Sequence, residues 1–152
     1  MLLGGPAPLF DCPDAEGNPV SLTQLRGKTV VLYFYPRDNT PGCTKEACGF
    51  RDYWVELQQS GVVVLGVSTD SQTSHQKFRD KFNLPFVLLS DPEAQLAQAY
   101  GVWGEKQFMG KTFLGVKRTT FIIDPAGQVS HIFTKVNTNT HALDILNVLR
   151  AA

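Results

Sequence analysis

"RGKTVVLYFYPRDNTPGCTKEACGFRD", residues 26–52, contains the pattern from which the fold can be worked out. Its apolar run from Val30 to Phe34 has the β-branched and aromatic content of a buried strand, and Pro36 ends that run. Residues 43–59 then place apolar side chains three or four positions apart, which predicts a helix that ends before Gly61. We therefore expect a central strand followed directly by a helix.

The rest of the chain repeats this order. The runs "VVVLGVS" and "FVLLSD" are typical of buried strands, whereas "SQTSHQKFRDKFN" and "PEAQLAQAYG" are typical of helices. Two short strands are expected around "DAEGNPV", and a β-hairpin in "RTTFIIDPAGQVSHIFTKV" precedes a terminal helix in "THALDILNVLRA". The sequence predicts one domain, residues 1–152, with a thioredoxin-like α/β sandwich: a central mixed β-sheet flanked by helices on both faces.

Composition and charge exclude several classes of partner. The 14 basic residues balance the 14 acidic ones and are scattered, so we expect neither nucleic acid nor a membrane surface as a partner. The start, "MLLGGPAPLF", has no basic segment, and no run reaches the roughly 18 apolar residues of a membrane span. We expect a soluble, cytoplasmic protein. Its three cysteines are too few, and odd in number, for a disulfide scaffold.

Cys43 falls in the first turn of the expected helix. With Thr40 as the N-cap, Pro41 takes the first helical position, where its missing N–H is harmless, and Cys43 takes the third. The backbone N–H groups and the dipole at this end favour an anion, so Cys43 is expected to form a reactive thiolate. The polar residues around it argue against the alternative, a small apolar side chain in the core.

A metal site is the other alternative for the two cysteines of this segment. The spacing of Cys43 and Cys48, C-x4-C, is wider than the usual C-x2-C of zinc sites, and no second pair of ligands follows at a suitable spacing. The three histidines are isolated in the sequence, and each is interpreted as a surface or capping residue. We expect no metal.

These residues resemble the active-site pattern of the peroxiredoxins. Pro36-x3-Thr40-x2-Cys43 matches that pattern, and "DNTPGCTKEACGFRD" with "YGVWGEKQFMGKTFLGVKRTTFIIDPAG" is similar to the Q subfamily, also called the bacterioferritin comigratory protein type, over nearly the whole chain. The resemblance implies that Cys43 is the peroxidatic cysteine, that Thr40 and Arg118 bind the peroxide, and that Pro36 shields the pocket. It also implies a hydroperoxide substrate, a thioredoxin-like reductant, a monomer, and no metal, haem or flavin.

Considered without the resemblance, two of these residues keep a plainer interpretation. Arg118 could be a solvated arginine at the edge of a strand, and Thr40 could do no more than cap the helix with its side-chain oxygen. In the peroxidase, Arg118 would offer fixed donors and a permanent charge to the thiolate and to the departing oxygen. The two roles of Thr40 would compete for the same hydroxyl.

Cys48 occupies a position at which many, though not all, members of this subfamily carry the resolving cysteine. A resolving thiol condenses with the sulfenic acid formed on Cys43 and gives a disulfide; a buried helix residue without redox role is the alternative. Five residues along an ideal helix separate the two α-carbons by roughly 8.7 Å. Because a disulfide requires less than about 7 Å, the helix should unwind when the bond forms.

The remaining candidates are interpreted more plainly. Cys12 lies in an apolar segment and is expected to pack rather than react, and the aromatic residues of the loop predicted between Trp103 and Phe113 are expected to pack as well. A general disulfide oxidoreductase is a rival function, but it would favour C-x2-C. A non-enzymatic redox sensor or binding module switched by the same disulfide is the second rival.

Overall fold

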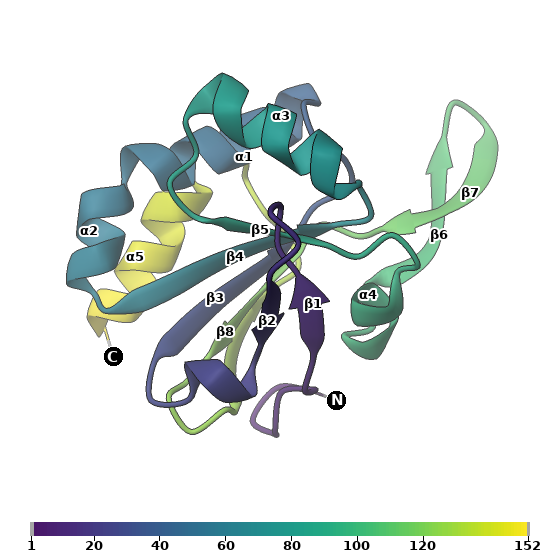
Figure 1. Cartoon of the computed structure of the whole chain (residues 1–152). Coiled ribbons are helices and arrows are strands. Elements are labelled where there is room, and N and C mark those ends of the chain that lie inside the picture. The colour runs from purple at the N-terminus through teal and green to yellow at the C-terminus, as the bar shows by residue number, and fades with distance from the viewer. Residues whose placement is uncertain (1, 152) are drawn as a thin grey trace.

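The structure, a computed structural model that describes residues 2–151, has a five-stranded mixed sheet at its centre (Figure 1). The strand order is β5-β4-β3-β8-β9, in which β3–β4 and β4–β5 pair in parallel and β3–β8 and β8–β9 pair antiparallel. The strands are β3 (Thr29–Phe34), β4 (Val62–Ser68), β5 (Val87–Ser90), β8 (Thr119–Ile123) and β9 (Val129–Phe133). The predicted thioredoxin-like fold with a mixed sheet is confirmed.

Helices and two small hairpins complete the chain. The helices are α1 (Pro41–Asp52), α2 (Trp54–Gln59), α3 (Gln72–Phe82), α4 (Gln95–Ala99) and α5 (His141–Ala151), with a 3₁₀ turn η1 (Thr23–Leu25). The hairpins are formed by β1 (Asp11–Pro13) with β2 (Pro19–Ser21), and by β6 (Trp103–Phe108) with β7 (Lys111–Val116). None of the helices in residues 2–151 has the length and apolar character needed to cross a membrane.

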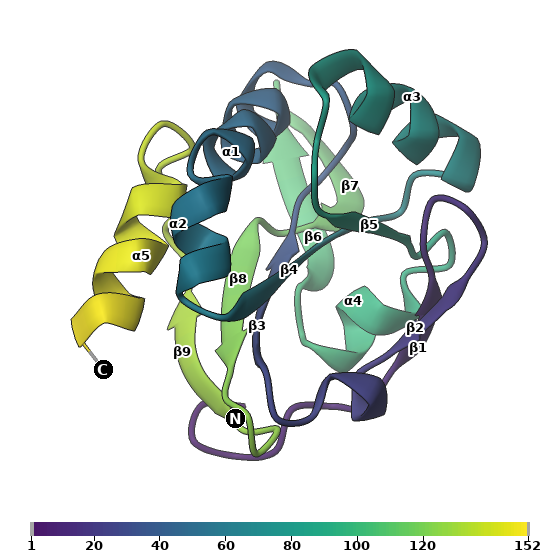
Figure 2. The ribbon, with the colours of Figure 1, turned by 60° about the vertical axis from the view of Figure 1, so that its left-hand side comes forward.

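The alternation of side chains along β3 divides the core into two layers. Val30, Leu32 and Phe34 pack on the face that α4 and the β1–β2 hairpin cover. Val31 and Tyr33 pack on the opposite face, which α1, α2, α3 and α5 cover (Figure 2). Because both faces of the sheet are covered, β3 is buried along nearly all of its length, as its continuous apolar run predicts.

The helix expected over residues 43–59 is two helices in the structure. It begins at Pro41, as expected with Thr40 as the N-cap, but it breaks at Tyr53, whose backbone leaves the helical region (φ −100°, ψ 18°). Tyr53 and Trp54 both pack against the core beneath α1 and α2. Successive side chains of one helix point about 100° apart, so the break lets both rings face the sheet.

The loop predicted between Trp103 and Phe113 is wrong, because this segment forms the β6–β7 hairpin. Met109 and Gly110 make its two-residue turn with positive φ (52° and 77°), as a tight hairpin requires. The hairpin projects from the body of the protein (Figure 1), and Phe108 and Met109 at its tip are 68% and 86% exposed. The packing expected for the aromatic residues holds for Trp103 but not for Phe108 or Phe113.

Candidate active site

The first turn of α1 holds Cys43 against the sheet. Thr40 is the N-cap in extended conformation, Pro41 follows at the first helical position, and the Thr44 N–H donates to the Thr40 carbonyl over 2.8 Å. The expected placement of Cys43 in the first turn is therefore confirmed. Its surroundings were predicted wrongly: Cys43 is only 1% exposed and belongs to the core layer that contains Tyr33. Of its polar neighbours in sequence, Lys45 is exposed whereas Glu46 is buried as Cys43 is, so the polar character of the segment does not indicate the position of the thiol.

Arg118 contacts the thiol directly. It stands between β7 and β8, and its Nη2 donates to Cys43 Sγ over 3.2 Å. Gly42 makes room for the guanidinium, because a Cβ at that position would lie 3.3 Å from Arg118 Nη2. Arg118 thus brings a permanent positive charge to the sulfur of a residue 75 positions away in the chain.

Glu46 anchors the same guanidinium, although it was not among the site residues predicted from the sequence. It follows Cys43 by three residues, so both side chains lie on one face of α1, and Arg118 Nη1 donates to Glu46 Oε1 over 2.5 Å. Burial raises the pKa of Glu46 to about 7, although Arg118 opposes this rise. The sequence signal for this residue was its three-residue spacing from Cys43. That spacing places an acidic residue beside the nucleophile on one helix face, where it can bind an arginine.

Several buried polar side chains lie around the ion pair of Arg118 and Glu46. Within residues 2–151, the Tyr33 hydroxyl and Glu46 Oε2 are the buried side-chain polar atoms without a hydrogen-bond partner. Burial, and then the charges of Glu46 and Cys43, raise the pKa of Tyr33, so it remains a phenol. His141 Nε2 lies 2.7 Å from Thr120 Oγ1 and 3.8 Å from Glu46 Oε2. Burial lowers the pKa of His141 to about 4, so it is neutral at pH 7.

Two of the three histidines are therefore not the surface or capping residues that were expected. His141 begins α5 but is 2% exposed, and His75 is completely buried. Only His131 is exposed, on β9. Isolation in the sequence is a poor guide here, because the polar partners of both buried histidines come from distant segments.

Thr40 and Pro36 lie in the connection from β3 to α1. The Thr40 hydroxyl does not cap the helix as expected; it donates to the Arg37 carbonyl over 3.1 Å. Its oxygen lone pairs remain free to accept a further hydrogen bond. Pro36 is half-buried and lies two residues beyond Phe34, the last residue of β3. Thr40 is therefore adjacent to the first turn of α1, which holds Cys43, and Pro36 precedes Thr40 by four residues in the same connection.

Cys48 lies in the same helix as Cys43, and both are free thiols. Cys48 is half-buried, and burial raises its pKa, with Arg51 opposing and Asp52 adding to the rise. The helix continues without interruption from Pro41 to Asp52. In this state the two sulfurs cannot bond, since five helical residues separate the α-carbons by about 8.7 Å.

Cys12 lies in the opposite core layer from Cys43. It is 6% exposed, its thiol donates to the Ser90 carbonyl over 3.1 Å, and it packs among the residues beneath α4. Burial first, and then Asp91 and Asp11, raise its pKa to about 12, so it stays protonated at neutral pH. This placement agrees with a packing role.

Cys12→Ser should leave peroxide turnover within about twofold of wild type, because the serine hydroxyl can make the same hydrogen bond to Ser90. Steady-state peroxide consumption with saturating reductant measures this. Appearance of a disulfide that contains Cys12 as the main oxidised product would contradict it.

Glu46→Gln should weaken the pH dependence of stability. The raised pKa of Glu46, about 7 against the usual 4.5, means that the unfolded chain loses this proton at lower pH than the folded protein. The stability that protonated Glu46 contributes is therefore fully present below its usual pKa of 4.5 and is lost as the pH rises towards about 7. Glutamine cannot ionise but still accepts from Arg118. The free energy of unfolding in urea, measured near pH 4.5 and near pH 7, should fall more for the wild type than for the variant. An equal fall would contradict the raised pKa of Glu46.

One group of side chains brings potential metal ligands close together. Within residues 2–151, the one group of three side chains with suitably close ligand atoms is Asp38, Asp70 and His75. Both nitrogens of His75 already face hydrogen-bond partners, and Asp70 Oδ2 accepts two hydrogen bonds. The donor set is therefore occupied by the protein itself and does not fit a metal ion.

The comparisons with known proteins agree with one another. The AhpC/TSA family model matches residues 3–132. A Coxiella burnetii protein named as a bcp peroxiredoxin is 50% identical over 147 residues, which cover 97% of both chains. Peroxiredoxin Bcp of Escherichia coli K12 is 47% identical over 147 residues, which cover 97% of this chain and 94% of that protein.

Two similar solved structures belong to the same group of peroxiredoxins as these relatives. The chain is similar to a structure of the Xanthomonas campestris bacterioferritin comigratory protein, with a TM-score of 0.91 and 38% identity. The match covers 99% of this chain and 97% of the other, and that study concerns alkyl peroxide reduction activity and a trapped intermediate. A peroxidoxin BcpB structure from Mycobacterium tuberculosis matches with a TM-score of 0.87 and 38% identity, covering 99% and 97% of the two chains.

Proposed function

The chain belongs to the AhpC/TSA family and is a peroxiredoxin peroxidase, and on this premise we propose that it reduces hydrogen peroxide and organic hydroperoxides through Cys43, with Cys48 as the resolving thiol and a thioredoxin-like dithiol as the reductant. The observation that carries the proposal is the 3.2 Å contact from Arg118 Nη2 to Cys43 Sγ. It supplies a fixed positive donor to the sulfur at the positive end of a helix.

In the oxidation step, the Cys43 thiolate attacks one oxygen of the peroxide and the O–O bond breaks. The sulfur becomes a sulfenic acid, and the departing oxygen takes a proton to leave as water or an alcohol. Arg118 is positioned to stabilise the negative charge as it moves from sulfur to the departing oxygen. The Thr40 hydroxyl donates its own proton to the Arg37 carbonyl, so its oxygen can accept a hydrogen bond from the O–H of the hydroperoxide. Pro36 would limit access of water from the end of β3.

In the resolution step, the Cys48 thiol attacks the sulfenic acid, and one water leaves as the disulfide forms. This requires α1 to unwind between Pro41 and Phe50, because the intact helix holds the sulfurs apart. Unwinding also removes the burial that raises the pKa of Cys48, so the resolving thiol ionises more readily once the helix has opened. Gly42 and Gly49 lower the stability of this helix, by up to about 1 kcal/mol each relative to alanine.

Reduction returns the enzyme to its starting state. A dithiol attacks the Cys43–Cys48 disulfide, forms a mixed disulfide, and leaves oxidised after its second thiol attacks. Because α1 is unwound in the oxidised protein, that dithiol can reach Cys48. The cycle needs no metal or organic cofactor, since the electrons come from the dithiol.

The discriminating experiment is peroxide consumption with a thioredoxin and its reductase, combined with mass spectrometry of the oxidised protein. We expect many turnovers for each protein molecule and a Cys43–Cys48 disulfide as the product. A single equivalent of peroxide consumed, with no turnover in the presence of reductant, would contradict the proposal and favour a redox sensor switched by the same disulfide.

A further inference from the structure

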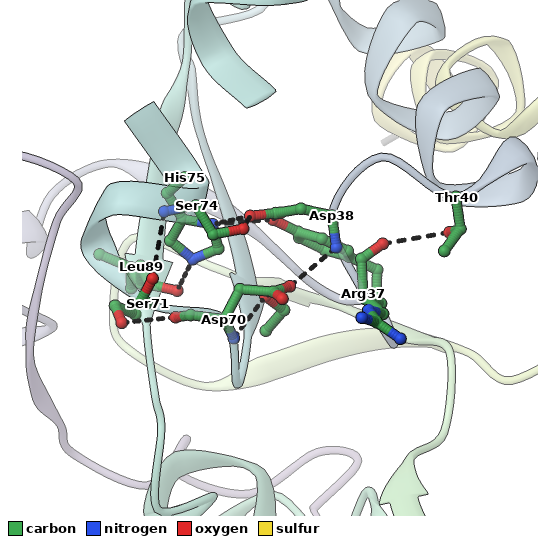
Figure 3. A network of polar contacts seen from close by, with 11 residues as sticks. Arg37, Asp38, Thr40, Asp70, Ser71, Ser74, His75 and Leu89 are labelled. Carbon is green, nitrogen blue, oxygen red and sulfur yellow. Dashed lines mark hydrogen bonds and ion pairs between the residues drawn. The ribbon is translucent and has the colours of Figure 1, made fainter. Parts of the chain in front are cut away.

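A buried polar network ties the loop that precedes α1 to α3 and to the sheet (Figure 3). At its centre is Asp38, which is 8% exposed although it lies in the connection between β3 and α1. One carboxylate oxygen accepts from the Tyr35 hydroxyl over 2.6 Å. The other lies 2.8 Å from the Ser74 hydroxyl and 2.7 Å from His75 Nδ1.

His75 carries this network into the sheet. It is completely buried on α3, and its Nε2 lies 2.8 Å from the Leu89 carbonyl in β5, which can only accept a hydrogen bond. Nε2 therefore carries a proton. Nδ1 lies within hydrogen-bond distance of Asp38 Oδ2, and the same carboxylate accepts from the Tyr35 and Ser74 hydroxyls. The imidazole links the loop to β5 through two hydrogen bonds.

The backbone of the loop is held as well. The Asp38 N–H donates to Asp70 Oδ2 over 2.7 Å, and the Ser68 hydroxyl donates to the same oxygen over 2.7 Å. Asn39 then takes a left-handed conformation (φ 61°), which turns the chain into Thr40 and the first turn of α1. Asparagine adopts this left-handed conformation more readily than most other non-glycine residues, so Asn39 suits the turn.

We infer that the Asp38–His75 pair is a positioning device for the peroxidase reaction, which sets the loop from Pro36 to Thr40 in the geometry that peroxide attack requires. This inference rests on the proposed function, because Pro36 and Thr40 are the residues assigned to the peroxide there. The anchor lies outside α1, in α3 and β5. The helix can therefore unwind for resolution while the loop stays in place.

The test separates oxidation from resolution by rapid mixing with hydrogen peroxide. In Asp38→Ala, the second-order rate constant for oxidation of Cys43 should fall about tenfold, as expected for a misplaced reacting group. The first-order rate constant for formation of the Cys43–Cys48 disulfide should not fall. Asp38→Asn keeps the shape, can accept from Tyr35 and can donate to neutral His75, so its oxidation should remain within about threefold of wild type.

Ser71→Ala is the matched control, since it removes the N-cap of α3 and leaves every bond of Asp38 in place. Its oxidation rate constant should equal that of wild type. If Asp38→Ala does not fold, Ser74→Ala removes one donor to Asp38 and should lower the oxidation rate constant by about threefold. The inference is overturned if Asp38→Ala oxidises within twofold of wild type, if Ser71→Ala slows equally, or if resolution slows in parallel.

Hydrogen exchange distinguishes this inference from the proposed function. Loss of the pair should speed exchange at the amides of residues 37–40 and leave α5 unchanged. A wild type that fails to turn over peroxide would overturn the function but not this structural effect. Unchanged exchange in Asp38→Ala would overturn the inference, whatever the activity.

Discussion

Replacement of Cys43 by serine should abolish peroxide reduction, with a fall in rate of more than about a thousandfold. A serine hydroxyl is far less ionised than a thiol at neutral pH, and the group in contact with the Cys43 sulfur is a guanidinium, which cannot take its proton. Peroxide consumption at saturating reductant measures the effect.

Cys12→Ser is the matched control for that substitution, because it makes the same chemical change in the opposite core layer. The control should keep its activity, whereas Cys43→Ser should lose it without loss of the fold. Retention of more than about a tenth of the wild-type rate by Cys43→Ser would show that another residue attacks the peroxide.

Arg118→Lys should lower the rate of peroxide reduction by about a hundredfold, although the charge is kept. The guanidinium binds Cys43 Sγ through Nη2 and Glu46 Oε1 through Nη1 at the same time. A single ammonium group cannot make both contacts in that geometry. The lysine would therefore pair with the buried carboxylate of Glu46 and would not donate to the Cys43 thiol. The peroxide rate and the rate of alkylation of Cys43 across pH should both change.

Arg79→Lys provides the control, since Arg79 pairs with Glu16 and Asp80 on the surface, away from Cys43. Surface ion pairs of this kind contribute little, so the control should match wild type. If Arg118→Lys also leaves the peroxide rate and the alkylation of Cys43 unchanged, the arginine takes no part in the reaction.

The central part of the fold was predictable because its signals are local. The run from Val30 to Phe34 is continuous and apolar, and the structure places it in the middle of the sheet with both faces covered. The β6–β7 hairpin was missed because its glycines were interpreted as loop residues. Gly104 and Gly115 pair across the hairpin, and a Cβ at either position would crowd the stems of Lys117 and Lys106.

The site was predictable in part. The cysteine at the start of α1 has a local signal in the Thr-Pro-Gly that precedes it, and only the family resemblance indicated Arg118. Glu46 could have been found from its three-residue spacing to Cys43 on one helix face. The pairing of Asp38 with His75 joins residues 37 positions apart, and no periodicity within one element connects them.

Hydrogen exchange across residues 41–52, before and after one equivalent of peroxide, tests the central claim most directly. That claim is that Cys43 and Cys48 are reaction partners that meet only when α1 opens. In the reduced protein the amides from Thr44 onwards should be protected by the hydrogen bonds of the helix from Pro41 to Asp52. In the oxidised wild type they should exchange faster, with a Cys43–Cys48 disulfide found by mass spectrometry, whereas oxidised Cys48→Ser should stay protected. A Cys43–Cys48 disulfide in a protein whose α1 remains fully protected would contradict the account.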